Sequence, residues 1–278
     1  MKPAHLALTL LAPAFGLGCG ALDSVTATTI VAGTVVRTPE LQVTGQFDVG
    51  AEVLASAWVG ERKNATDTGE PAPITGADVN VTFAGNRIAL PEQSTNGLYL
   101  TNTVDEPNSG LIYEGGITYT VRASIEDGSV AEYGGTVTAP TILTPAALNL
   151  SPQPTDMVPG FPNILVHPKS TALNVSWAGE QFGRYPYVSV FRANPNDNSN
   201  PELVFDNRPE SAQETIEFIL GTPPTSVDIP AETFDADGIY GVVVVIMDRH
   251  DSLLPNTFIG SPVLAGSGAA VVLGVGTP

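Results

Sequence analysis

Apolar and polar residues alternate along much of the chain with a period of two. Residues 53–59 and 119–125 are clear cases, and the alternating segments are rich in Val, Thr, Ile and Tyr. Gly, Asn, Asp and Pro interrupt these segments at the short spacing, roughly 8–12 residues, that separates the strands of small β-domains. Helical periodicity is scarce. Since alternation is typical of strands with one buried face, the pattern predicts an all-β protein.

Two tight turns are predicted between these strands. Ala84-Gly85-Asn86 separates the alternating residues 79–83 from Ile88 and Leu90, which predicts a hairpin. Asp127-Gly128 follows the strand expected at 119–125 and is the clearest tight-turn signal in the chain. Many short strands joined by such turns favour β-sandwiches.

A proline-rich stretch divides the chain. Proline removes a ladder donor and favours extended backbone, so we expect a stiff linker there. Its prolines are Pro140, Pro145, Pro152, Pro154, Pro159 and Pro162. The predicted division is a first β-sandwich over 39–140, a linker over 141–162 and a second β-sandwich over 163–278.

The first nineteen residues have the composition of an export signal. Lys2 is followed by a mostly apolar stretch over 4–17, and Gly18 precedes Cys19, the only cysteine of the chain. A basic start, a short apolar segment and small residues at the cleavage point define a secretory signal. The segment resembles the signal of a bacterial lipoprotein, whose cysteine is lipidated. The resemblance implies cleavage of residues 1–18 and a lipid anchor on Cys19.

Residues 19–38 are predicted to tether this anchor to the first sandwich. They are polar at first and then rich in Val, so their second part can pair as a strand. Many Gram-negative lipoproteins of the inner membrane have Asp after the cysteine, whereas this chain has Gly20. The resemblance therefore implies the outer membrane, on either its periplasmic or its surface face. The alternative is an ordinary secreted protein in which Cys19 is removed or remains a free thiol.

Three segments of the second half resemble a fibronectin type III domain, which is an immunoglobulin-like sandwich. Residues 173–177 match its second strand with the core tryptophan Trp177, and 187–191 match its third strand. Residues 234–242 resemble its tyrosine corner, with Tyr240 as the corner residue. A looser likeness in the first half places Gly116 shortly before Tyr119. The resemblance implies two immunoglobulin-like sandwiches in tandem, a fold that hosts many unrelated functions.

The chain is strongly acidic, with a formal charge of −18 at pH 7. A surface of this sign repels phosphate backbones and excludes nucleic acid as a partner. Apolar residues make up 42% of the sequence, which is the content of a folded chain rather than of a disordered one. The expected partners are a membrane, through the lipid anchor, and an envelope protein or polysaccharide.

Side chains suited to catalysis are scarce. A Ser-His-Asp mechanism needs a histidine base, and only His167 and His250 lie beyond the signal. Both have turn-forming neighbours, so we interpret them as exposed loop residues. The single cysteine lies at the processing point, and no Gly-rich phosphate loop opens a helix. We predict no catalytic residue, no enzyme activity and no cofactor.

Two loops carry enough oxygen donors to be considered as binding sites. Asp235 and Asp237, with Gly238, form a short Asp-x-Asp-Gly sequence that could give ligands to calcium. The same residue types are ordinary turn formers, so both interpretations stay open. The second loop is dense in amides and is the predicted binding loop, with the loop at 64–73 beside it. Its candidate residues are Asn194, Asn196, Asp197, Asn198 and Asn200.

The expected function is that of a non-enzymatic cell-envelope lipoprotein, acting as a binding, adhesion or scaffold module. One alternative is a carbohydrate-processing hydrolase or accessory protein that uses paired carboxylates, which a pocket with two converging acids favours. Another is a structural subunit of an envelope transport assembly, which a large exposed apolar patch favours. Trp58 and Trp177 could form a carbohydrate platform, but their alternating positions favour a place in the core.

Overall fold

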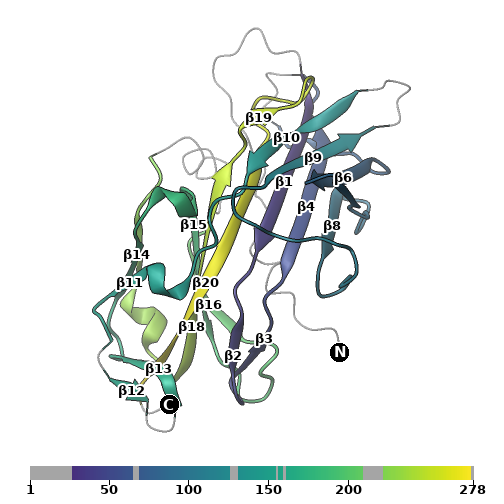
Figure 1. Ribbon diagram of the computed structural model, residues 1–278. Helices are drawn as coiled ribbons and strands as arrows, with labels where there is room; N and C mark the ends of the chain where they lie inside the picture. The colour runs from purple at the N-terminus through teal and green to yellow at the C-terminus, as the bar shows by residue number, and fades with distance from the viewer. Residues whose placement is uncertain are drawn as a thin grey trace.

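The computed structural model describes residues 27–64, 69–125, 131–154, 156–158, 161–208 and 222–276. Strands dominate these ranges, and they pack as β-sandwiches lying side by side (Figure 1), so the predicted all-β sandwich fold is confirmed. The helical elements are short 3₁₀ turns: η1 (Pro145–Ala147), η2 (Glu180–Phe182) and η3 (Ala231–Phe234). Within the described ranges no helix is long and apolar enough to cross a membrane. Cys19 and the predicted Asp127-Gly128 turn lie outside them.

The first sandwich consists of two facing groups of strands. β1, β4, β5 and β8 form one layer, and β6, β7, β9 and β10 form the other. Their bounds are β1 (Thr29–Arg37), β4 (Val53–Glu61), β5 (Ala72–Pro73), β6 (Asp78–Phe83), β7 (Asn86–Ala89), β8 (Leu98–Asn102), β9 (Thr118–Ser124) and β10 (Glu132–Thr138).

Alternation along these strands fills the space between the two layers. In β9, Tyr119, Val121 and Ala123 are fully buried, while the residues between them are partly exposed. The predicted hairpin is confirmed, because Phe83 pairs with Asn86 across a two-residue turn. Gly85 provides the positive φ, +84°, that a hairpin turn of this length requires.

The second sandwich has the same two-layer plan. β11, β14 and β17 form a three-stranded sheet, which faces β16, β15, β18, β20, β13 and β12. Their bounds are β11 (Leu148–Ser151), β12 (Met157–Val158), β13 (Phe161–His167), β14 (Leu173–Trp177), β15 (Tyr185–Arg192), β16 (Glu202–Asp206), β17 (Ser226–Ile229), β18 (Gly238–Arg249) and β20 (Val263–Val275).

The residues that suggested a fibronectin type III domain occupy the expected places. Trp177 is buried in the core of the second sandwich with Leu173 and Val175 of the same strand. The Tyr240 hydroxyl donates to the carbonyl oxygen of Ala236 at 2.8 Å, four residues upstream, which is a tyrosine corner. In the first sandwich the Tyr119 hydroxyl donates to the carbonyl oxygen of Ile112 at 2.9 Å, which parallels this corner.

One strand, β20, joins the two sandwiches into a continuous ten-stranded sheet. It pairs antiparallel with β18 along nearly its whole length. On its other edge, residues 263–267 pair parallel with β1, and residues 273–275 pair parallel with β13. Figure 1 shows the long β18–β20 hairpin reaching from the second sandwich across to the first. Val263 and Ala265 accordingly belong to the first core, and Leu273 belongs to the second.

The connection between β18 and β20 also pairs with the other layer of the first sandwich. It contains β19 (Ser252–Leu253), which pairs antiparallel with β10. The Asp251 amide donates to the carbonyl oxygen of Thr136 at 2.7 Å, and the Thr138 hydroxyl donates to the Asp251 carboxylate at 2.7 Å. The tip of the hairpin is thus hydrogen-bonded to both layers of the first sandwich.

A hairpin from the first half covers the outer face of the second sandwich. β2 (Leu41–Val43) and β3 (Phe47–Val49) pair with each other, and Leu41 and Phe47 are buried against β15, β18 and β20. Two glycines allow the close approach. A Cβ on Gly241 would lie 2.6 Å from Leu41 Cδ2, and a Cβ on Gly268 would lie 2.6 Å from Pro39 Cδ. The second sandwich therefore has three layers where this hairpin lies.

The structure differs from the predicted division of the chain at two places. Residues 29–37, within the expected 19–38 tether, are β1, which pairs with β4 and β20 and places Val31 and Val35 in the first core. The expected 141–162 linker contains β11, whose Leu148 and Leu150 pack against the second core. Pro145 and Pro152 lie just outside this strand, since proline cannot donate to the ladder.

Replacing Gly241 with valine should destabilise the fold by forcing the β2–β3 hairpin away from β18. Overpacking a close contact of this kind costs about 1–3 kcal/mol, which lowers the midpoint of urea unfolding. Gly50→Val is the matched control, because a Cβ at Gly50 meets nothing within 4 Å. Equal unfolding midpoints for the two variants would contradict the third layer.

A chain reduced to residues 141–278 should self-associate. Without the first sandwich, residues 263–267 of β20 become an unpaired edge, and Val263 and Ala265 lose the core in which they are buried. Unpaired apolar edges template aggregation. Size-exclusion chromatography with light scattering, with the full chain as control, measures this. If the short chain is a monodisperse monomer, the edge of β20 does not need β1 to prevent self-association, and the prediction is wrong.

Candidate functional site

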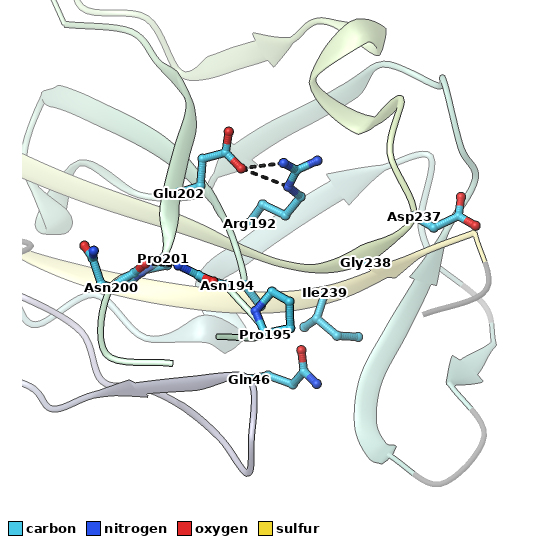
Figure 2. Close-up of a pocket in the computed structure, with 11 residues that line it drawn as sticks. Gln46, Arg192, Asn194, Pro195, Asn200, Pro201, Glu202, Asp237, Gly238 and Ile239 are labelled. Carbon is cyan, nitrogen blue, oxygen red and sulfur yellow. Dashed lines mark hydrogen bonds and ion pairs between the residues drawn. The ribbon is translucent and has the colours of Figure 1, made fainter. Parts of the chain in front are cut away.

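A pocket of about 860 Å³ opens where β18 begins, at the end of the second sandwich. Three segments far apart in the sequence meet there: the β2–β3 turn, the β15–β16 connection and the first residues of β18 (Figure 2). The lining residues are Gln46, Arg192, Ala193, Asn194, Pro195, Asn200, Pro201, Glu202, Asp237, Gly238 and Ile239. Gln46 comes from the β2–β3 hairpin, and the other lining residues come from the second sandwich.

The predicted binding loop forms one wall of this pocket. Of its five candidate residues, Asn194 and Asn200 line the pocket, whereas Asn196, Asp197 and Asn198 do not appear in the lining. The loop is held to the β2–β3 hairpin by the Asp48 amide, which donates to the carbonyl oxygen of Asn198 at 2.9 Å. The loop is therefore fixed where the hairpin covers the second sandwich.

Several of the loop's polar groups shape the loop itself. The Asn194 side-chain oxygen accepts from the Asn196 amide at 3.0 Å. The Asp197 carboxylate accepts from the Ser199 amide at 3.2 Å and from its hydroxyl at 2.7 Å. These are the local side-chain to backbone bonds that Asn and Asp make in turns. Asn194 and Asp197 thus act mainly as turn formers, while the Asn200 side chain is exposed.

An ion pair lies across the pocket. Arg192 and Glu202 are direct partners in the β15–β16 ladder, and the guanidinium donates from Nε and Nη2 to the same carboxylate oxygen, Oε2 (Figure 2). The Nε to Oε2 distance is 3.1 Å. The hydrogen bonds that the Arg192 guanidinium donates to this carboxylate raise the pKa of Arg192. The pair therefore holds both side chains in place at the pocket.

The two aspartates weighed as calcium ligands each have a partner within the protein. Lys169 Nζ donates to Asp237 Oδ1 at 2.7 Å, and the Ser170 hydroxyl donates to Asp235 Oδ1 at 2.7 Å. The carboxylate of Asp237 raises the pKa of Lys169 through this hydrogen bond. Within the described ranges, no three His, Cys, Asp or Glu side chains lie close enough to hold a metal ion. Asp237 lines the pocket, and Asp235 does not appear in its lining.

The prediction that His167 lies in an exposed loop is wrong. His167 ends β13 and is 0% exposed, with Nε2 at 2.8 Å from the carbonyl oxygen of Thr171 and its ring edge-on to Phe234. The apolar residues that precede it carry the strand into the core, and the ring continues that packing. His167 is therefore a structural core residue.

His250 lies beside the tip of the long hairpin and is half-buried rather than exposed. Burial lowers the pKa of His250, the neighbouring Arg249 lowers it further, and Asp251 raises it. Its Nδ1 atom is buried and has no hydrogen-bond partner within the described part of the chain. Neither histidine lines the pocket.

The two tryptophans do not form a common platform. Trp177 lies in the core of the second sandwich, as its alternating position indicates. Trp58 belongs to β4 of the first sandwich and donates from Nε1 to the carbonyl oxygen of Asn96 at 2.9 Å. Neither tryptophan is among the described residues that line the pocket.

Sequence reasoning missed Gln46, Arg192 and Glu202. Arg192 and Glu202 flank the Asn-rich loop on two strands that a hairpin pattern pairs, so an opposite-charge cross-strand pair was available as a signal. Gln46 had no such signal, because its place depends on where the β2–β3 hairpin packs.

No protein-family model matches the chain, and no curated protein matches it. Among solved structures, the chain is similar to the crystal structure of the chicken CNTN1 FN1-FN3 domains. That match has 12% identity and a TM-score of 0.23, and it covers 89% of this chain and 69% of that chain. A second similar structure is a marsupial T cell receptor, with 12% identity and a TM-score of 0.22, covering 87% of this chain and 74% of that chain.

These neighbours are fibronectin type III and immunoglobulin-like proteins. At such TM-scores the likeness carries no argument about function. The sandwich fold of this chain rests on its own strand pairing and on its two cores.

Acid should destabilise the fold through His250. Its pKa in the folded state lies below the ordinary value of 6.5, so the unfolded chain binds the proton more readily. The contribution of neutral His250 to stability is complete above about pH 6.5 and is lost as the pH falls below it. We expect His250→Asn to lose less stability than the wild type between about pH 7.5 and about pH 5.5. Thermal unfolding at the two values tests this, and parallel losses in both proteins would contradict it.

Proposed function

We propose that this protein is a non-enzymatic, lipid-anchored binding or scaffold module of the bacterial cell envelope. The anchor is the lipid expected on Cys19, which lies outside the described residues, and the outer membrane is its expected location. The sandwich body presents the pocket described above.

The pairing of β20 with both β1 and β18 is the observation that carries this proposal. It makes the two sandwiches one hydrogen-bonded unit, so the chain that arrives from Cys19 leads into the shared sheet at β1. Nine residues separate Cys19 from Thr29, and a chain of that length spans at most about 35 Å. An anchor at Cys19 would thus hold the whole body close to the membrane.

The pocket lies at the opposite end of the sheet from the first residue of β1. The Phe258 amide, near the tip of the long hairpin, donates to the carbonyl oxygen of Thr29 at 2.8 Å. Gly238 of the pocket is at the far end of β18, twelve residues from that tip. At about 3.4 Å per residue this separation is about 40 Å. Such a layout suits a module that displays its binding site away from the anchored end.

The hydrolase alternative has less support. Glu202 and Asp237 both line the pocket, but the first is bound by Arg192 and the second by Lys169. A glycosidase needs one carboxyl group that carries a proton to the leaving group. Both carboxylates here instead accept hydrogen bonds from cationic groups, Glu202 from Arg192 and Asp237 from Lys169.

The structural-subunit alternative has no specific observation in its favour. The large exposed apolar side chains of the described ranges lie in separate segments, and single exposed residues of this kind are common on monomers. They are Val104, Ile112, Met157, Leu203 and Ile259.

Intact mass of the membrane-extracted protein, beside a Cys19→Ala variant, tests the anchor. We expect the wild type to begin at Cys19 and to carry added acyl mass, because two or more acyl chains give stable membrane attachment. The variant should move to the soluble fraction. Ser24→Ala, a change of similar size nearby, should leave the protein in the membrane. An unmodified wild-type chain in the soluble fraction would overturn the proposal.

A further inference from the structure

The pocket contains polar groups whose hydrogen-bonding capacity the protein leaves unused. The side-chain amides of Gln46 and Asn200 make no hydrogen bond with another described residue, and both line the pocket. In the Arg192–Glu202 pair both guanidinium bonds reach Oε2, so Oε1 of Glu202 remains free to accept. Two amides and one carboxylate oxygen are therefore available to a ligand.

We propose that this pocket binds a neutral oligosaccharide through Gln46, Asn200 and Glu202. The inference rests on the proposed function, because it names the ligand class of the binding module. It assigns to the pocket a recognition chemistry that belongs to both halves of the chain, since Gln46 lies in the β2–β3 hairpin and Glu202 begins β16.

Sugar hydroxyls match the unused groups in kind. A hydroxyl donates one hydrogen bond and accepts up to two, an amide does both, and a carboxylate oxygen accepts. Glu202 Oε1 can therefore accept a hydrogen bond from one sugar hydroxyl, while the side-chain amide of Gln46 or Asn200 donates to an adjacent hydroxyl. Pro195 and Ile239, which Figure 2 shows beside Gln46, offer apolar surface to the C–H groups of a sugar ring.

The charges at the pocket disfavour anionic ligands. Both carboxylates of the lining are already paired, Glu202 with Arg192 and Asp237 with Lys169, so the local charges balance and neither cation is without a carboxylate partner. Phosphorylated or uronic-acid ligands would meet repulsion from the whole protein, whose net charge is −18. A hydroxyl-rich ligand without charge avoids this repulsion.

The size of the pocket is that of a small-molecule site. Its volume of about 860 Å³ lies within the range of about 300–1,000 Å³ typical of such sites. A single ion would fill little of it, whereas a short chain of sugar rings would contact all three segments. The loop wall is held by its internal bonds and by Asp48, so little ordering is needed when the ligand binds.

Titration calorimetry on the full membrane-extracted chain tests the proposal. The probes are maltotriose, cellotriose and tri-N-acetylchitotriose, with trigalacturonate as the anionic comparison and trialanine as the peptide comparison. We expect saturable binding of at least one neutral trisaccharide, and no binding of trigalacturonate or trialanine. Gln46→Ala and Glu202→Gln should each weaken that binding by about tenfold, the loss of one ligand hydrogen bond.

Gln42→Ala is the matched control, because Gln42 is exposed on the same hairpin and lies outside the pocket lining. It should leave the binding constant unchanged. Equal weakening by Gln42→Ala and Gln46→Ala would overturn the proposal. So would preference for trigalacturonate or trialanine, or no binding of any neutral probe at about 10 mM, ten times the constant of a weak site.

The two proposals fail separately. If the chain is lipidated at Cys19 but binds no saccharide, the proposed ligand class is wrong and the proposed anchored module stands. If the chain binds a saccharide through Gln46 but carries no lipid, the proposed ligand stands and the proposed anchor is wrong.

Discussion

The hydrogen-bond ladder of β20 is the constraint on which the rest of the structure depends. This one strand of 13 residues pairs with β18 on one edge and with both β1 and β13 on the other. Its first half fills the core of the first sandwich, and its second half fills the core of the second. Tandem sandwiches linked only by a connecting segment can turn against each other. Here the shared ladder leaves no such freedom at the junction.

The pocket is a product of the same constraint. After β1, which pairs with β20, the chain continues along the outer face of the second sandwich. Because Gly241 and Gly268 have no Cβ atom, Leu41 and Pro39 can pack directly on that face. Gln46 then reaches the end of β18, where Arg192 and Glu202 are already paired across their ladder. The second sandwich by itself would therefore present this pocket without Gln46.

Local patterns in the sequence predicted the local structure well. Alternation located the strands, Ala84-Gly85 located a hairpin turn, and the residues around Tyr240 predicted a tyrosine corner that the structure contains. These features depend on residues within one strand or one turn. The Asn-rich loop was predicted for the same reason, although Asn194 and Asp197 bond within the loop and, of its five candidates, only Asn194 and Asn200 line the pocket.

Contacts between distant residues could not be predicted in this way. Nothing in residues 29–37 indicates a parallel partner at 263–267, because either edge of a Val-rich strand suits many neighbours. His167 looked like a loop residue beside Pro168, and only the packing of Phe234 against its ring shows that it belongs to the core. The place of Gln46 depends on both of the long-range pairings at once. The sequence therefore located the Asn-rich loop, which forms one wall of the pocket. It did not predict Gln46, which the β2–β3 hairpin adds to the lining.

The pairing of the first strand with the last also sets the order in which the chain can fold. The Val31 amide donates to the Ser261 hydroxyl across 230 positions, so this contact closes a very long loop. Contacts of such separation form late, since the entropy of loop closure is lost before they stabilise anything. At about 5–20 residues per second, β1 waits about 10–50 s for its partner to be synthesised. During that interval β1 lacks the strand that covers its second edge, and the core of the first sandwich lacks Val263 and Ala265.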